Sequence, residues 1–338
     1  MSTRLLILTF FTFFISSITL KAQKLEYDFT FQGIGDNREY KPEYGFSQTI
    51  IGERTSFELG TTIEDIHQIR IGLSHFYEFG APANYNKPQI TAYYRFKEKN
   101  TQFYFGAFPR IRTIDFPLAI ISDTIQYYKP NIEGLLARHN WSWGREGNTV
   151  EGHQIVFIDW TGKRLANNRE KFFAATSGKI NYKNLFFENF ISLYHHALSQ
   201  GGDINEHISD NFGYNINLGY NFKCNELNYS YLKIGVLGSA LRERNVNEEF
   251  ITGTSFFNEI FITRKNIALR NTIMLGNGQN FLTGDKFYQQ DNYMRSDFTW
   301  TMIRGKNILV SFTQSFHFIN WNSMSNQQKI TLFYNINR

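Results

Sequence analysis

The chain lacks most of the features that stabilise small secreted domains or that mark nucleic-acid-binding proteins. It has a single cysteine, Cys224, so an intrachain disulfide is excluded. Its net charge of +5 is modest for 338 residues, and the basic residues form no contiguous patch, which argues against a nucleic-acid partner. Beyond the N-terminus there is no apolar run of the roughly 20 residues that a membrane-spanning helix needs.

Motifs of metal binding and catalysis are also missing. There is no HExxH or CxxC spacing and no glycine-rich phosphate-binding loop, so we predict no metal and no cofactor. The candidate groups for a hydrolase are His195 and His196, with Ser192 or Ser199 nearby. On a strand, however, adjacent histidines point to opposite faces and cannot act as a pair. The sequence therefore predicts that the protein is not an enzyme.

The first 22 residues have the features of an export signal. Arg4 is followed by the apolar stretch 5–18, and Ala22 supplies the small residue that precedes cleavage. An N-terminal membrane anchor is the alternative, but the apolar stretch is shorter than the roughly 20 residues required to span a bilayer. We expect a signal peptide at 1–22 and a mature chain that begins at Gln23.

Aromatic residues are abundant, although the mean hydropathy of the chain is negative. Phe, Tyr and Trp make up 17% of the residues, with 34 Phe and 19 Tyr, which is more than an ordinary soluble domain carries. The wall of a transmembrane β-barrel combines both properties, because alternate residues face lipid while the others face a wet lumen. Composition therefore favours a barrel.

Short polar turns recur along the chain at a nearly constant spacing. From Asp65 to Lys306 the intervals between them average about 40 residues, enough for two strands of roughly ten residues, one tight turn and one longer loop. The seven turns lie at 63–65, 97–100, 144–148, 181–184, 223–226, 263–266 and 304–307. Two strands around each turn, together with a first and a last strand, predict about 16 strands, with 14 or 18 as alternatives.

Hydrophobic alternation is clearest at 211–222, where six apolar or aromatic residues alternate with asparagine and glycine. This length suits a tilted strand that crosses a bilayer. In hydrocarbon an open sheet edge would leave backbone groups without partners, so the sheet must close on itself. The predicted fold is all-β, a closed antiparallel transmembrane β-barrel over 23–338. Its termini and short turns, Cys224 included, should face the periplasm.

Charged residues recur at positions that the alternation assigns to the lumen. They are Glu58, Arg70, Arg95, Arg138, Arg270, Arg295 and Asp297. In a narrow pore, arginines that face acidic residues set up a transverse field that orients and filters hydrated solutes. Alternatively, these side chains pair with one another and only make the wall rigid. The two roles are compatible.

The longest connection, 109–131, is too apolar for a freely solvated loop, since it contains five isoleucines. Charged residues accompany them, among them Arg110, Arg112, Asp115 and Asp123. A loop of this composition must pack against a surface, and the barrel interior is the surface available to it. We therefore expect 109–131 to fold inward and to narrow the lumen, with its charged residues among those that select solutes.

With its short turns, long loops and inward-folding third long loop, the chain resembles porins. Its export signal, ending before Gln23, is similar to that of surface proteins of Bacteroidetes. The resemblance covers 24–338 and rests on patterning, with one departure: the chain ends in Asn337-Arg338, where many such barrels end in Phe. It implies a channel in a Gram-negative outer membrane for passive or weakly selective diffusion of small hydrophilic solutes.

Two other interpretations remain open. A non-transporting barrel would act as a surface receptor or as a subunit of a secretion or polysaccharide machine, with a homo-oligomer or machine partner besides outer-membrane lipid. A membrane-embedded hydrolase is the third interpretation.

The segment 158–164 would either bind a sugar ring or, as we favour, contribute to an aromatic girdle. That girdle is predicted to comprise Trp141, Trp143, Trp160, Tyr194, Tyr220 and Trp321.

Overall fold

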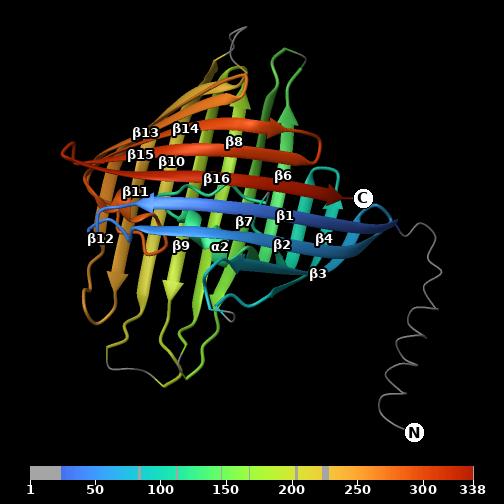
Figure 1. The fold of residues 1–338 in the computed structure, drawn as a ribbon, viewed down its shortest axis with the longest axis horizontal. Coiled ribbons are helices and arrows are strands. Elements are labelled where there is room, and N and C mark those ends of the chain that lie inside the picture. The colour runs from blue at the N-terminus through green and yellow to red at the C-terminus, as the bar shows by residue number, and fades with distance from the viewer. Residues whose placement is uncertain are drawn as a thin grey trace.

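The computed structural model describes residues 24–337, apart from 83–84, 112, 146, 167, 202–204 and 223–227. Within this part, antiparallel strands follow one another around a closed barrel, and β1 pairs with β16 to complete it (Figure 1). The strands are β1 (Lys24–Glu39), β2 (Gln48–Ile63), β3 (His67–Glu78), β4 (Gln89–Glu98), β5 (Thr101–Pro109), β6 (Asn131–Trp143), β7 (Val150–Gly162), β8 (Lys171–Tyr182), β9 (Leu185–His196), β10 (Ser209–Phe222), β11 (Ser230–Glu243), β12 (Ile251–Arg264), β13 (Ile267–Gly276), β14 (Asn292–Arg304), β15 (Ile308–Ile319) and β16 (Ser323–Asn337). The predicted fold class and the prediction of 16 strands are confirmed.

Side-chain alternation along each strand separates a lipid-facing wall from a lumen-facing wall. On β10, Phe212, Leu218 and Tyr220 are exposed on the outside, whereas Asn215 and Asn217 are buried on the inside. Helical structure is limited to α2 (Asp123–Tyr128) and the 3-10 turn η1 (Lys286–Gln289). No helix in the described part of the chain is long and apolar enough to cross a membrane.

The short turns lie at one end of the barrel, together with the start of β1 and the end of β16 (Figure 1). Three of them are two-residue Lys-Asn turns, in which Lys99, Lys183 and Lys265 have φ angles of 45°, 54° and 52°. The turn that contains Cys224 and the predicted signal peptide lie outside the described residues. Cleavage before Gln23 and the periplasmic position of Cys224 stay predictions.

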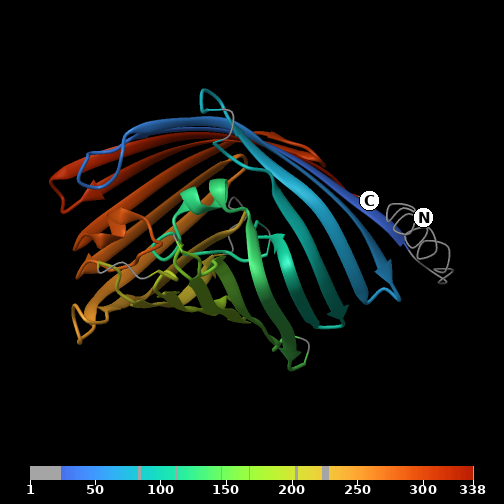
Figure 2. The same ribbon diagram turned by 90° about the horizontal axis from the view of Figure 1, so that it is seen from below.

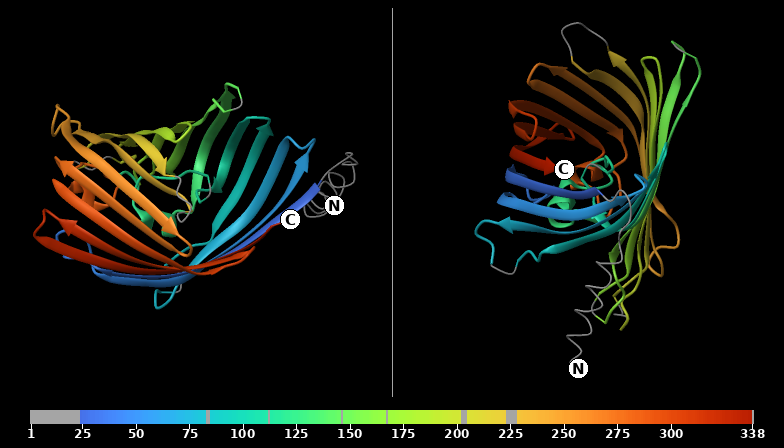
Figure 3. Two further views of the ribbon diagram at one scale, coloured as in Figure 1. Left: turned by 90° about the horizontal axis from the view of Figure 1, so that it is seen from above. Right: turned by 90° about the vertical axis from the view of Figure 1, so that its right-hand side faces the viewer.

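Two long loops enter the barrel from the opposite end and pack together; we call residues 110–130 and 277–291 the plug (Figures 2 and 3). Ile120 and Ile121 are buried in one apolar cluster with Phe157 and Phe190 of the wall. The loops are joined by backbone bonds, among them Ser122 N to Thr283 O (2.9 Å). The inward fold of the first loop agrees with the sequence-based expectation; the second loop was not anticipated.

The aromatic girdle is largely where the sequence predicts it. Trp143, Trp160, Tyr220 and Trp321 are exposed, and Trp141 stacks on Trp143 with ring centroids 4.8 Å apart. The prediction for Tyr194 is wrong. Tyr194 has the same strand parity as the buried Phe190, so it points inward and packs against the plug cluster.

Candidate functional site

Between the plug and the short-turn end, the lumen contains a cavity of about 1090 Å³. Plug residues such as Phe116 and Leu118 form one side of it, and inward-facing polar residues of the wall form the rest. The lumen therefore has two halves: a dry half filled by the apolar plug cluster, and a wet half lined by charge.

Most of the predicted lumen residues border this cavity. Those that line it are Arg110, Asp115, Asp123, Arg138, Arg270, Arg295 and Asp297. Glu58, Arg70 and Arg95 lie on the inner wall of β2, β3 and β4, outside the cavity lining. There Arg70 pairs with Glu26 (2.7 Å), and Arg95 donates to Gln102 Oε1 (3.3 Å). Arg112 lies outside the described residues.

Several of these charges are already paired within the protein. Arg110 forms an ion pair with Asp159, both almost completely buried, and Arg295 Nε donates to Asp297 Oδ1 (2.7 Å). Arg138 donates to the carbonyl oxygen of Thr113 and so holds the plug. A structural role is therefore established for these contacts, whereas solute selection remains a proposal.

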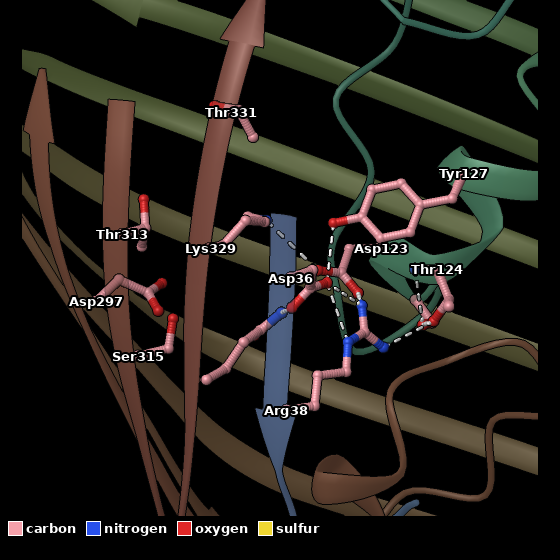
Figure 4. A network of polar contacts seen from close by, with 12 residues as sticks. Asp36, Arg38, Asp123, Thr124, Tyr127, Asp297, Thr313, Ser315, Lys329 and Thr331 are labelled. Atoms are coloured by element: carbon pink, nitrogen blue, oxygen red, sulfur yellow. Dashed lines mark hydrogen bonds and ion pairs between the residues drawn. The ribbon is translucent and has the colours of Figure 1, made fainter. Parts of the chain in front are cut away.

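Helix α2 of the plug is tied to the barrel wall by a polar network (Figure 4). Arg38 of β1 lies between Asp36 (2.6 Å) and Asp123 (3.2 Å). The Tyr127 hydroxyl donates to Asp36 Oδ2 (3.0 Å), and Lys329 of β16 lies 3.5 Å from Asp123. Burial alone would raise the pKa of Asp123, but the Lys329 and Arg38 cations lower it to about 2.

A second charged network on the cavity wall was missed by the sequence reasoning. Glu188 accepts from Lys179 (2.7 Å) and lies 3.3 Å from Lys233, which in turn lies 3.2 Å from Glu259. Tyr231 donates to Glu259 Oε1 (2.6 Å). Both acidic residues sit in runs with apolar residues on both faces, so their facing could not be derived from alternation.

The outer wall carries a different polar feature at the long-loop end. Five outward-facing residues on successive strands are direct cross-strand partners of one another, and we call them the rim row: Trp160, Phe172, His195, Asp210 and Arg242. Their outward facing follows from parity, since Val156, Ile191 and Phe212 on the same strand faces are exposed apolar residues. The rim row thus lies at the edge of the lipid-facing band.

A histidine–carboxylate pair is the centre of the rim row. His195 Nδ1 lies 2.8 Å from Asp210 Oδ1, and the His195 ring stacks on Phe172 with centroids 5.1 Å apart. Asp210 Oδ2 also accepts from Arg242 Nη2 (3.0 Å) and from Arg244 Nε (2.9 Å). With Nδ1 directed at Asp210, the other ring nitrogen, Nε2, is left to accept a proton.

The two histidines considered from the sequence do point to opposite faces, as predicted. His196 points inward, where it is partly buried near the Lys171 and Arg169 cations. His195 points outward to Asp210. The pairing of His195 with Asp210 could not be predicted from the sequence, because a loop as long as 197–208 leaves the register between β9 and β10 undetermined. No group of three or more His, Cys, Asp or Glu in the described residues is placed to hold a metal ion.

Comparison with protein families decides where the chain belongs. A family model described as lipid A 3′-O-deacylase-type matches residues 18–338. The chain belongs to this family. The prediction that the protein is not an enzyme is therefore wrong, because its family is named for an enzyme. The prediction failed because it relied on contiguous catalytic motifs, and the sequence offers none. No curated protein matches the chain in sequence.

Solved structures show the same architecture. The outer membrane protein OpdK of Pseudomonas aeruginosa aligns with a TM-score of 0.51 at 9% identity, covering 93% of this chain and 99% of that chain. OccK9 (OpdG) of the same organism has a TM-score of 0.51 at 10% identity, with 93% and 99% covered. OccK8 (OprE) has a TM-score of 0.52 at 10% identity, with 93% and 98% covered. The protein has the fold of an outer-membrane porin, as the sequence predicted.

Proposed function

We propose that the protein hydrolyses an acyl ester of lipid A at the outer surface of the barrel, with the rim row as the reacting site. The observation that carries this proposal is the His195–Asp210 pair on the lipid-facing wall at the long-loop end. Lipid A lies in the outer leaflet, so an acyl ester there is reached from outside the barrel rather than from its lumen. Membership of the lipid A 3′-O-deacylase-type family supports an ester as the substrate.

In this proposal His195 is the general base and Asp210 orients it. Nε2 of His195 takes a proton from a water molecule as the water oxygen adds to the ester carbonyl carbon. The tetrahedral intermediate then expels the sugar oxygen, which takes the proton from His195, and a free fatty acid leaves. Arg242 and Arg244 are placed to stabilise negative charge beside this centre.

Aromatic residues of the rim row and its surroundings suit an interfacial substrate. The Trp160 and Phe172 rings stack with centroids 5.3 Å apart, and the Arg242 guanidinium lies 4.7 Å from the ring centroid of Phe250. Such rings contact acyl chains on one side and polar headgroups on the other. The site thus offers an apolar surface next to a base and two cations.

The test uses two neighbouring histidines as a matched pair. Purified protein in mixed micelles is given lipid A, and mass spectrometry follows the loss of an acyl chain. His195→Asn is expected to lower the rate by roughly 10²- to 10⁴-fold, the usual contribution of a general base. His196→Asn, on the opposite face, should keep the wild-type rate. Activity that survives His195→Asn, or that is lost equally in both variants, would contradict the assignment.

The charged cavity favours a second candidate function, the passage of small hydrophilic solutes. Arg138 and Arg270 face this cavity, and fixed charge on a narrow wall sets ion preference. Arg138→Gln with Arg270→Gln should shift the reversal potential in planar bilayers toward cation preference. Arg95→Gln, on the inner wall outside the cavity, is the control. Trimming the apolar residues of loop 110–130 should raise conductance. A protein that conducts in none of these forms would rule out the channel.

A further inference from the structure

The lipid-facing wall carries a second row of polar residues, nearer to the middle of the strands. His139, Gln154, Gly178 and Asn189 are direct cross-strand partners on β6, β7, β8 and β9. Thr176 lies two residues from Gly178 on β8. We call these five residues the mid-wall row; it is separate from the rim row, and the inference drawn from it does not depend on the proposed function.

The mid-wall row faces outward. Its members have the strand parity of exposed apolar side chains: Leu135 on β6, Val156 on β7, Ile180 on β8 and Ile191 on β9. Residues of the other parity, such as Phe157 and Phe190, are buried inside the barrel. The row is therefore set among side chains that contact the hydrocarbon of the membrane.

Hydrogen bonds hold the row in one conformation. Gln154 Nε2 donates to Thr176 Oγ1 (2.5 Å) and to Asn189 Oδ1 (3.4 Å). The Gln154 side chain reaches Asn189 by lying across Gly178, where an added Cβ would come within 2.0 Å of Gln154 Oε1. Glycine at position 178 thus makes room for the amide to cross β8.

Part of this polar surface is still unpaired. Within the described residues, neither Oε1 of Gln154 nor the Nδ2 of Asn189 has a hydrogen-bond partner. Polar groups that face hydrocarbon without partners are costly, and lipid tails offer neither donors nor acceptors. Gln154 and Asn189 therefore present one acceptor and one donor, at fixed positions, to a molecule beside the barrel.

We propose that the mid-wall row is the contact between two copies of this chain in the membrane. In a two-fold symmetric dimer each residue meets the same surface of the partner. The free Gln154 Oε1 of one copy can accept from the free Asn189 Nδ2 of the other, and the reverse bond forms at the same time.

Cross-linking between single cysteines tests this dimer. Because Cys224 is the only cysteine of the chain, Cys224→Ser gives a background free of thiols. In that background Thr176→Cys should form a disulfide-linked dimer in isolated outer membranes upon mild oxidation. Leu59→Cys, exposed on the outer face of β2, is the matched control and should stay monomeric.

A second variant separates the contact from folding. Gln154→Leu with Asn189→Leu, in the Thr176→Cys background, should lose the cross-link while the barrel keeps its resistance to unfolding in cold detergent. Equal cross-linking at Thr176→Cys and Leu59→Cys would overturn the proposal. So would cross-linking that survives the leucine pair, or that occurs only through Asn271→Cys on the outer face of β13.

Discussion

The two halves of the lumen place charged residues in opposite surroundings. Where the plug meets the wall at the border of the cavity, Arg110 and Asp159 are each 3% exposed. In the half with the cavity, Lys179 and Glu188 are 23% and 26% exposed, and Glu188 also contacts Lys233. The same kind of ion pair is thus a rigid anchor in one half and a screened surface contact in the other.

This difference explains why charge alone was an ambiguous signal for function. A buried ion pair in the plugged half mainly fixes which way the plug docks, because breaking it leaves an uncompensated charge. A partly solvated charge on the cavity wall can exchange its partner for a solute. Four experiments test the contrast, from the largest expected effect to the smallest.

The largest effect concerns which half faces the outside of the cell. Cys224 should be periplasmic, because β10 ends and β11 begins at the end of the barrel that carries the start of β1 and the end of β16. A membrane-impermeant thiol reagent should label intact cells poorly and label them fully after the outer membrane is permeabilised. Equal labelling of intact and permeabilised cells would contradict this orientation and would place the plugged half on the periplasmic side.

The next effect is the loss of the anchor in the plugged half. Among the described residues, Arg110→Met leaves the buried Asp159 carboxylate with only the Glu133 backbone N–H as a partner. This should cost about 3–5 kcal/mol of docking free energy. The loop around Ile114 should then become sensitive to protease in detergent. Adding Asp159→Leu should recover part of the loss, since no buried charge remains. An unchanged protease pattern in Arg110→Met would contradict the anchor role.

Much of this molecule was predictable from sequence because every strand of a barrel must alternate lipid-facing with lumen-facing residues, and every pair of strands needs a short turn. The short turns, the alternation of 211–222 and the apolar loop 109–131 each follow from a local pattern, and the structure bears them out. The rim row and the mid-wall row did not follow, since their members meet only through strand register. Register across a long loop such as 197–208 has no local signature.

Residues of the plug show the same limit on prediction. Asp123 was predicted as a lumen charge, yet its partners Arg38 and Lys329 lie far away in sequence, at the strands that close the barrel. Likewise, η1 packs Phe287 against His317, with ring centroids 4.2 Å apart, and nothing in its sequence marks it as buried. Contacts between an inserted loop and the wall depend on which strands meet when the barrel closes. Sequence patterning predicts that the barrel closes, but not which wall residues then contact the loop.

A moderate effect is expected from pH on the second loop of the plug. Burial raises the pKa of Asp285 to about 6, above the roughly 3.9 of a free aspartate. The docked loop therefore binds the proton more tightly than the undocked loop. Docking is strongest at low pH and loses about 1–3 kcal/mol as the pH rises through 6. Protection factors of the amides in 277–291, which correct exchange for its intrinsic pH dependence, should be lower at pH 8 than at pH 5.

Asp285→Asn separates titration from capping. The amide can still accept from Phe287 N, as Asp285 Oδ1 does at 3.2 Å, but it carries no charge. Protection factors in this variant should be high at both pH values. Asp291→Asn, which changes an exposed neighbour that accepts from Gly278 N, should keep the wild-type pH dependence. A pH dependence that persists in Asp285→Asn would assign the titration to another group.

The smallest effect is expected where the ion pair is wet. Lys179→Met removes one of the two cations that contact Glu188, but Lys233 remains at 3.3 Å and water reaches the site. We expect a loss of less than about 1 kcal/mol in the free energy of unfolding, measured by urea titration in lipid vesicles. Protease sensitivity of the plug should not change, because Lys179 lies on the cavity wall rather than at an anchor. If Lys179→Met destabilised the barrel as much as Arg110→Met, the two halves would be equally dry and the contrast between them would fail.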